Sequence, residues 1–197
     1  MPFTLVSVTP DLVQRAFPHT KRANIAANLP HVLEGLRARG LVDRQMVMMA
    51  LATIAAETAQ FVPIDEGKSR WNTSPGGVPF GLYDAGTVKG ADLGNTEPGD
   101  GLRFRGRGFV QLTGRWNYAE TAKLVDRDLV AEPELANHPA VAGQILAAFL
   151  AKRAPKIRAA LEAGDLARAR RLVNGGSHGL DEFTACWRRL DQLLPKD

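Results

Sequence analysis

Residues 101–120 read GLRFRGRGFVQLTGRWNYAE, and this stretch decides how the rest of the chain is interpreted. Three arginines alternate with small or aromatic residues, a period of two that predicts a strand with three guanidinium groups on one face. These arginines are Arg103, Arg105 and Arg107. A turn and then a helix over residues 115–125 are expected next, with amide and hydroxyl side chains around the turn. These polar residues are Gln111, Thr113 and Asn117.

Glycine marks the region before this stretch as irregular. Eleven of the 19 glycines lie between residues 63 and 108, which predicts turns, loops and short strands there. Earlier in the chain, Thr9 before Pro10 predicts a helix start, Gly40 a helix end, and Asp43 the cap of the next helix. Apolar residues then recur at helical spacing, so we expect a helix of about five turns that is buried along one face.

The C-terminal part is also predicted to be helical. Helices are expected over residues 115–125, 140–152, 156–163, 165–173 and 181–194, separated by proline and glycine. We therefore expect one mainly α-helical domain over residues 1–197. Its helical lobe would comprise residues 1–62 and 109–197, and residues 63–108 would form a small, irregular, glycine-rich β and loop insertion. A cleft between the two parts would suit a long ligand.

Composition places the chain among folded globular proteins. Of its 197 residues, 45% are hydrophobic and 23% are charged, which excludes disordered and fibrous classes. The sequence shows neither a long apolar run nor a secretory leader, so we expect a protein made in the cytoplasm. The formal charge of +4 favours an anionic partner, such as nucleic acid, a membrane surface or an acidic wall polymer.

Glu57 is the first candidate for chemistry because it lies on the apolar side of its helix, three residues after Ile54 and four before Phe61. A carboxyl group held among apolar side chains keeps its proton more readily than one in water. General-acid cleavage of a glycosidic bond requires such a protonated carboxyl group. The alternative is a glutamate near a helix end that forms a salt bridge.

A glycosidase pairs its acid with a second carboxylate about 5 to 9.5 Å away. The candidates in the glycine-rich region are Asp65, Glu66 and Asp84. Glu66 lies nine residues beyond Glu57, where a chain leaving the helix can fold back across a cleft. For each candidate the alternative is a solvated loop acid.

The order of short motifs resembles that of the family 19 glycoside hydrolases, the plant-type chitinases and related bacteriophage endolysins. The motifs are AAETAQF at 55–61, YDAG at 83–86, DLGNTEPGDG at 92–101, RFRGRGFVQLTGRWNY at 103–118 and LVNGG at 172–176. The resemblance runs from about Asp43 to Asp191. It implies a lysozyme-like, two-lobed α+β fold with a deep cleft, and hydrolysis of β-1,4 bonds next to an N-acetylated sugar without any cofactor.

The resemblance also implies roles for individual residues. Glu57 matches the family's proton donor, which lies in an ET motif at a helix end. The residues expected to bind substrate are Tyr83, Arg107, Gln111, Thr113, Asn117 and Asn174. The four histidines show no ligand spacing, so no metal site is expected. Cys186 lies on the apolar face of the last predicted helix and is expected to pack in the core.

The identity of the second carboxylate stays open at this stage. Chitinases of the family place it in a longer loop, whereas lysozyme-like endolysins often place it nine residues after the first glutamate. Glu66 fits the endolysin spacing and is our prediction. Asp84 lies where many endolysin-like relatives have a Tyr-Glu pair, so it is the alternative. Some phage lysozymes have a threonine about six residues after the second acid. The corresponding position here is occupied by Asn72, so the residue that would position the attacking water is not defined.

Two classes of function follow. The first is a monomeric hydrolase acting by acid–base attack of water, with peptidoglycan as the favoured polymer and chitin as the alternative. A bacteriolytic phage or prophage endolysin of this kind would be made without a signal peptide and act on the wall after release, with neither nucleic acid nor a membrane as stable partner. The second is a non-catalytic module that binds nucleic acid or an anionic polymer through the arginine cluster. A glutamate on a buried helix beside a glycine-rich cleft favours the hydrolase.

Overall fold

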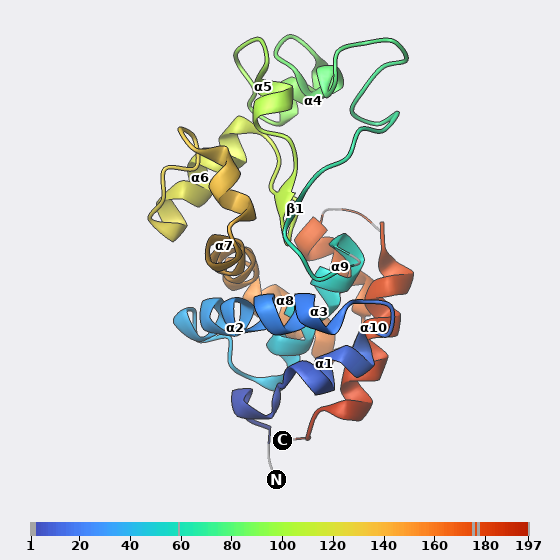
Figure 1. Cartoon of the computed structure of the whole chain (residues 1–197). Helices are drawn as coiled ribbons and strands as arrows, with labels where there is room; N and C mark the ends of the chain where they lie inside the picture. Colours follow the sequence, from blue (N-terminus) through green and yellow to red (C-terminus); the bar gives the residue numbers. More distant parts are fainter. Residues whose placement is uncertain (1–2, 59, 175, 177, 197) are drawn as a thin grey trace.

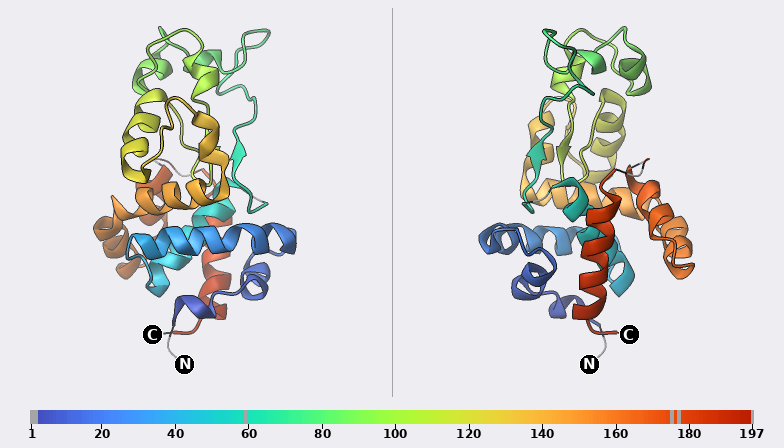
Figure 2. Two further views of the ribbon diagram at one scale, coloured as in Figure 1. Left: turned by 60° about the vertical axis from the view of Figure 1, so that its left-hand side comes forward. Right: turned by 90° about the vertical axis from the view of Figure 1, so that its right-hand side faces the viewer.

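The chain folds into two lobes in the computed structural model, which describes residues 3–58, 60–174, 176 and 178–196 (Figure 1). The helical lobe contains α1 (Pro10–Ala16), α2 (Arg22–Ala38), α3 (Arg44–Glu57), α8 (Ala154–Glu162), α9 (Leu166–Asn174) and α10 (Leu180–Leu193). The second lobe, here called the loop lobe, spans residues 63–137. It contains β1 (Ile64–Asp65), α4 (Val88–Asp92), α5 (Asp100–Arg103), β2 (Arg107–Gly108) and α6 (Arg115–Val125). α7 (Pro139–Ala151) lies between the lobes, as the views of Figure 2 also show.

Three short 3₁₀ helices complete the secondary structure of the described residues: η1 (Leu5–Ser7), η2 (Gly81–Tyr83) and η3 (Pro133–Asn137). η1 and the end of α10 lie at the far end of the helical lobe (Figure 1). None of the helices in the described part of the chain is long and apolar enough to cross a membrane.

The helix starts predicted from capping residues are confirmed. Thr9 Oγ1 accepts a hydrogen bond of 3.2 Å from the Leu12 amide at the start of α1. Asp43 Oδ1 accepts one of 3.1 Å from the Met46 amide at the start of α3. α6 spans the 115–125 range that the sequence predicts, and α7 to α10 begin and end within two residues of the predicted limits.

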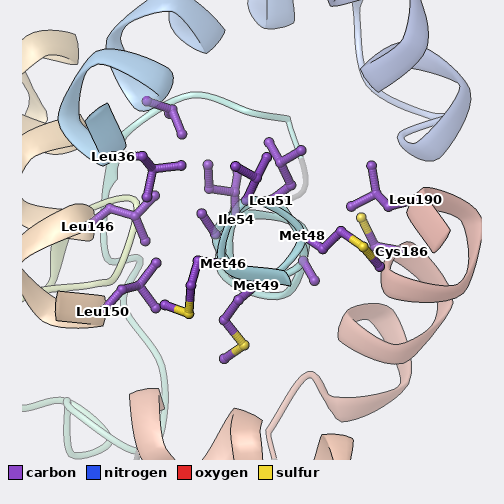
Figure 3. Close-up of a cluster of buried hydrophobic side chains, with 14 of the residues drawn as sticks. Leu36, Met46, Met48, Met49, Leu51, Ile54, Leu146, Leu150, Cys186 and Leu190 are labelled. Carbon is purple, nitrogen blue, oxygen red and sulfur yellow. The ribbon is translucent and has the colours of Figure 1, made fainter. Parts of the chain in front are cut away.

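α3 is buried on every side rather than along one face. Its residues from Met46 to Ala52 are fully buried, and other helices surround it (Figure 3). In Figure 3, Leu36, Leu146 and Leu150 pack on one side of α3, and Cys186 and Leu190 on the other. The helix has 14 residues, about four turns rather than the five predicted. A helix that is apolar all round belongs at the centre of a core, and α3 is that centre here.

α7 contributes to two separate cores. Ala142, Leu146 and Leu150 join the large core around α3. On another face, Val141, Ile145 and Ala148 join a smaller core in the loop lobe, together with Phe104 and Tyr118. The sequence placed the boundary between the insertion and the helical lobe at residue 108. The smaller core contains residues from both sides of this boundary, so α6 packs with the insertion rather than with the helical lobe.

α2 and α7 approach each other so closely that only glycine fits at the crossing. A Cβ atom on Gly35 would lie 2.4 Å from the carbonyl oxygen of Gly143, and one on Gly143 would lie 2.4 Å from that of His31. Both glycines therefore allow backbone-to-backbone packing of the two helices.

The glycine-rich region forms loops, short helices and one small sheet. β1 and β2 have two residues each and pair antiparallel, with Ile64 opposite Gly108 and Asp65 opposite Arg107. The strand predicted across Arg103, Arg105 and Arg107 is wrong, because Arg103 ends α5 and only the last of the three lies in a strand. Alternation over five residues was too short a signal to distinguish a strand from a turn between two elements.

Candidate active site

Glu57 is the last residue of α3, at the point where the buried helix reaches the space between the lobes. Thr58 leaves the helical conformation with φ −137°, and its amide still donates to the Ile54 carbonyl. The Glu57 side chain is 13% exposed, so it is largely shielded but open to one side. The core around α3 therefore fixes this carboxyl group at the end of a rigid element.

A buried arginine, which the sequence analysis did not identify, holds Glu57. Arg170 Nη2 donates to Glu57 Oε1 at 2.7 Å, and the Arg170 side chain is fully buried. The same guanidinium group donates to the His178 carbonyl oxygen. Glu57 thus forms the salt bridge that was named as the alternative, and it also borders the space between the lobes, so the ion pair and a place in the cleft coexist. Arg170 follows Leu166 by four residues and precedes Val173 by three, so a charge on an apolar stripe could have revealed it, as it did Glu57.

A cavity of about 390 Å³ lies beside Glu57 and is lined by residues of both lobes. Four of the predicted substrate-binding residues line it together with Glu57: Gln111, Thr113, Asn117 and Asn174. Asn117 Nδ2 donates to the Thr113 carbonyl, which links the turn to α6. The structure therefore brings these predicted residues to one site, although they are spread over more than 110 positions of the sequence.

Asn174 ends α9 on the side of the helical lobe. Its Nδ2 donates to the His178 carbonyl at 3.1 Å, and its Oδ1 accepts from the Gly176 amide at 3.0 Å. Gly175 of the LVNGG motif lies outside the described residues.

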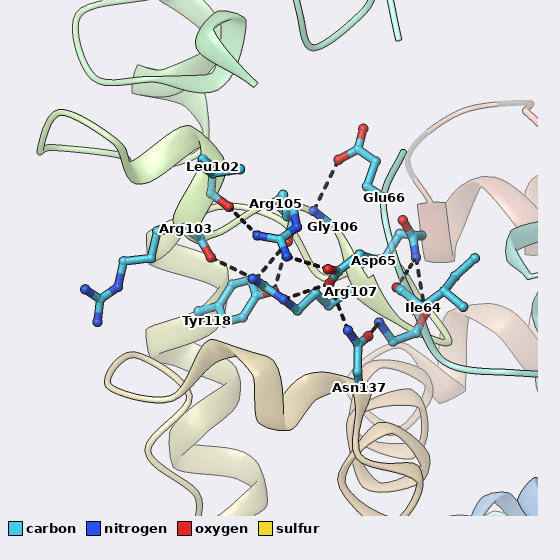
Figure 4. Close-up of polar contacts among 12 residues, drawn as sticks. Ile64, Asp65, Glu66, Leu102, Arg103, Arg105, Gly106, Arg107, Tyr118 and Asn137 are labelled. Carbon is cyan, nitrogen blue, oxygen red and sulfur yellow. Dashed lines mark hydrogen bonds and ion pairs between the residues drawn. The ribbon is translucent and has the colours of Figure 1, made fainter. Parts of the chain in front are cut away.

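Glu66 lies in the loop lobe just after β1, and it does not itself line the cavity beside Glu57. Its Oε1 accepts hydrogen bonds from Asn72 Nδ2 at 2.9 Å and from the Tyr83 hydroxyl at 3.0 Å. Its Oε2 accepts from the Gly106 amide at 3.2 Å, a contact drawn in Figure 4. Three donors from three separate segments orient this carboxylate, which is the arrangement of a positioned group rather than a solvated loop acid.

Gly106 and Gln111 connect the surroundings of the two glutamates. A Cβ atom on Gly106 would lie 2.9 Å from Gln111 Oε1 and 3.1 Å from Glu66 Oε2, so a larger residue would push one of them away. Gln111 also lines the cavity beside Glu57. Its backbone has φ 52°, a left-handed conformation that is uncommon outside glycine and typical of strained functional positions.

Tyr83 extends the site along the loop lobe. It borders a second cavity with Lys89 and Asp92, and this cavity shares Leu93 and Thr113 with the one beside Glu57. The two cavities thus form one cleft, with Tyr83 toward one end. Burial, followed by the neighbouring Glu66 carboxylate, raises the pKa of Tyr83, so the hydroxyl group stays protonated and donates to Glu66.

Asn72, where a threonine was expected from the resemblance, is fully buried and organises the loop after Glu66. Besides Glu66, it donates to the Gly67 carbonyl. Its Oδ1 accepts from the Ser69 amide and the Thr73 hydroxyl. Asn72 thus orients the Glu66 carboxylate through a direct hydrogen bond. From the sequence, this position showed only that asparagine replaces the expected threonine.

Asp84, the alternative second carboxylate, has a clear structural task. Its Oδ2 accepts from the Gly99 amide at 3.0 Å and its Oδ1 from the Gly101 amide at 3.2 Å. These backbone hydrogen bonds, that from Gly99 first, lower the pKa of Asp84. Neither Asp84 nor Glu66 lines a cavity of the cleft. The Glu66 carboxylate, however, is hydrogen-bonded to the Tyr83 hydroxyl and lies beside Gly106, next to Gln111 of the cleft, whereas both Asp84 oxygens are engaged by backbone amides, so the geometry favours Glu66 as the second carboxylate.

Arg107 does not face the cleft, which corrects the prediction that it binds substrate. Its side chain is only 1% exposed, with Nε 3.0 Å from Asp65 Oδ1. Its Nη1 donates to the Arg103 carbonyl and the Tyr118 hydroxyl (Figure 4). Arg105 also pairs with Asp65. The arginines of the GRG region therefore stabilise the loop lobe, and they do not form a common cationic face for an anionic polymer.

The chain is mainly helical and has the lysozyme-like fold of the family 19 chitinases. Two solved structures with this fold are similar over 97% of the chain at 18% sequence identity. One is chitinase C from Streptomyces griseus, with a TM-score of 0.64 over 79% of that chain. The other is a bacterial family 19 chitinase, with a TM-score of 0.66 over 98% of that chain.

Similarity to a curated protein is also found in sequence. A glycosyl hydrolase family 19 domain-containing protein of Haemophilus influenzae is 37% identical over 98 residues, which is 49% of this chain and 46% of that protein. The chain thus spans about half the length of this relative. No family model matches the chain. The resemblance to the family 19 glycoside hydrolases is confirmed by this relative in sequence and by the two chitinases in fold.

Proposed function

We propose that the chain is a glycoside hydrolase that cleaves β-1,4 linkages of the N-acetylated glycan of peptidoglycan. The observation that carries the proposal is Glu57 in a cleft lined by amide and hydroxyl side chains, with a second oriented carboxylate, Glu66, joined to that cleft through the Tyr83 hydroxyl. Acid–base hydrolysis of a glycosidic bond requires two such groups on either side of the bond.

Glu57 acts as the proton donor in this proposal. Arg170 engages Oε1, and among the described residues no hydrogen bond reaches Oε2, so Oε2 is the oxygen free to carry the proton to the leaving group. Glu66 acts as the base. The donors Asn72, Tyr83 and the Gly106 amide hold it as an oriented carboxylate that can activate water.

Chitin is the second candidate substrate, favoured by the two structural neighbours, which are chitinases. Peptidoglycan is favoured by the nine-residue spacing of the two glutamates and by the positive charge of +4, which suits an anionic wall. In the same proposal, the protein is an endolysin that acts on the wall after release from the cytoplasm.

Mass spectrometry of the products tests the proposal. Purified peptidoglycan and chitin oligomers are incubated with the protein and with its Glu57→Gln variant. We expect the wild-type protein alone to release disaccharide-repeat fragments from peptidoglycan, and their reducing-end sugar identifies the cleaved bond. Cleavage of chitin oligomers only would establish the second candidate, and no cleavage of either polymer would disprove both.

A further inference from the structure

A groove leads away from the cleft between α6 and α7. The cavity beside Glu57 shares Asn117, Phe149 and Arg153 with a neighbouring cavity on these helices. That cavity shares four residues with a third one: Glu120, Leu124, Ala148 and Lys152. Arg39, just after α2, borders the third cavity. Together the second and third cavities form what we call the α6/α7 groove, which opens from the cleft.

The α6/α7 groove is strongly cationic. Its four basic side chains are Arg39, Lys123, Lys152 and Arg153, against a single acid, Glu120. Lys123 Nζ lies 2.5 Å from Glu120 Oε1. The hydrogen bond from Lys123, then its charge and that of Lys152, lower the pKa of Glu120. One carboxylate faces several cations, so the groove has a positive charge in excess.

This excess distinguishes the groove from the part of the loop lobe where arginines are paired with acids. Arg105 and Arg107 pair with Asp65, and Arg115 pairs with Asp100. In the groove, by contrast, Arg39 donates to the Leu124 carbonyl and Arg153 to the Phe149 carbonyl. A neutral carbonyl does not cancel the charge of a guanidinium group, so these cations attract anions.

The groove also offers an apolar surface beside its cations. Trp116 is 57% exposed and Leu124 is 43% exposed, and both line the groove. Large exposed apolar side chains next to unneutralised cations suit a ligand with both an aliphatic and a carboxylate part. A neutral sugar polymer has no carboxylate for these cations.

We propose that the α6/α7 groove binds the carboxylate-bearing peptide stems that branch from a glycan strand lying in the cleft. The inference rests on the proposed function and specifies its substrate class. Because the groove opens beside Asn117 and Arg153 of the cleft, a stem attached to a sugar near Glu57 can enter it while the strand stays in place. The groove thereby selects branched, anionic glycan over unbranched, neutral glycan.

Co-sedimentation with purified sacculi free of teichoic acid tests this inference. All proteins carry Glu57→Gln so that the sacculi stay intact. The groove variant adds Lys123→Gln and Lys152→Gln, and the control adds Lys21→Gln and Lys156→Gln, two exposed lysines outside the groove. We expect about tenfold weaker binding for the groove variant, from two surface charges, and less than twofold for the control.

Two further conditions identify the source of the binding. Raising the salt from 0.1 M to 1 M should reduce the difference between groove variant and control, because the Debye length falls from about 10 Å to about 3 Å. Glycan strands whose stems have been removed with an amidase should bind both variants equally. Thermal unfolding of all variants serves as the folding control.

The inference is overturned if the groove variant binds sacculi as the control does, if its loss is the same on stem-free strands, or if no protein sediments with sacculi. These outcomes are separate from the product analysis above. A wild-type protein that cleaves peptidoglycan while the groove variant binds normally disproves only the groove. A protein that cleaves neither polymer but binds stems through the groove disproves only the hydrolase.

Discussion

The two lobes are stabilised in different ways, and each supplies one of the two carboxyl groups. In the helical lobe, α3 is surrounded by apolar side chains, and Glu57 is fixed because the whole helix is immobilised. In the loop lobe, short segments are held by ion pairs and side-chain hydrogen bonds, centred on Asp65, Asp84 and Asp100. Glu66 is fixed by individual donors rather than by the packing of a long element.

This difference has a consequence for mutational tolerance. Apolar burial is non-directional, so cores accept substitutions that conserve volume. Hydrogen bonds and ion pairs depend on particular atoms, so a replacement of the same size can remove the interaction altogether. The helical lobe should therefore tolerate change in side-chain identity, whereas the loop lobe should tolerate much less.

The largest effect is expected from the carboxyl group of the helical lobe. Glu57→Gln should lower the hydrolysis rate about 10²- to 10⁴-fold, because an amide cannot donate the proton. The glutamine oxygen can still accept from Arg170, but the buried guanidinium group loses its counter-charge, so we also expect a lower thermal midpoint. Steady-state turnover and thermal unfolding are the measurements. Activity above a tenth of wild type would remove Glu57 from the role of acid.

The second effect concerns the carboxylates of the loop lobe. Glu66→Gln should lower turnover about 10²-fold or more, whereas Asp84→Asn should mainly lower the thermal midpoint. The reason is that Asp84 holds two backbone amides, while Glu66 is hydrogen-bonded to Tyr83, which borders the cleft. Measuring both quantities for both variants gives the ranking. The reverse ranking of turnover would assign the base to Asp84.

The third effect tests the tolerance of the helical lobe. Leu51→Ala in α3 should cost about 2 to 5 kcal/mol of unfolding free energy, because the side chain is fully buried and leaves a cavity. Leu51→Met, which conserves volume, should cost less than about 1.5 kcal/mol. Denaturant titration of both variants is the measurement. Equal losses would show that this core, too, depends on atomic detail.

The smallest effect is expected from an ion pair of the loop lobe. Partial burial alone would raise the pKa of Asp65, but hydrogen bonds from Arg105 and Asn137 and the charge of Arg107 bring it below the ordinary value of 3.8. Asp65→Asn should cost about 1 to 2 kcal/mol near neutral pH, less than a fully buried pair because Asp65 is 41% exposed.

The pH dependence of that variant follows from the sign of the shift. A lowered pKa in the folded state means that the stabilisation is present above pH 3.8 and is lost as the pH falls through the lower, folded-state pKa. The thermal midpoints of wild type and Asp65→Asn should therefore differ at pH 6 and converge toward pH 2. A constant difference over this range would show that the cost of the variant is steric.

The sequence predicted the helices well because their signals are local. Thr9, Asp43 and the run of apolar residues in α3 each act within one or two turns, so they can be recognised without the fold. The glycine-rich region could be predicted only as irregular. Its structure depends on partners far apart in the chain, such as Asp84 with the Gly99 amide or Asp65 with Asn137.

The site was predictable where residue type and order carried the information. The family resemblance assigned four polar residues to the same site as Glu57, and all five residues line one cavity: Glu57, Gln111, Thr113, Asn117 and Asn174. Arg107 was wrongly predicted to bind substrate because a sequence motif does not indicate whether an arginine is buried. Its partner Asp65 also lies 42 residues earlier in the chain. The pairing of Arg170 with Glu57 could not be predicted because the two residues lie 113 positions apart.

α7 limits how the two lobes can move relative to each other. One face of α7 packs in the core of the helical lobe, and another face packs in the smaller core of the loop lobe. The close approach of Gly35 and Gly143 also holds the α7 backbone against α2. A hinge opening of the lobes would have to expose one of these apolar faces to water, at a cost that grows with the area uncovered. The residues of both lobes that line the cleft are therefore held in fixed relative positions before any ligand binds.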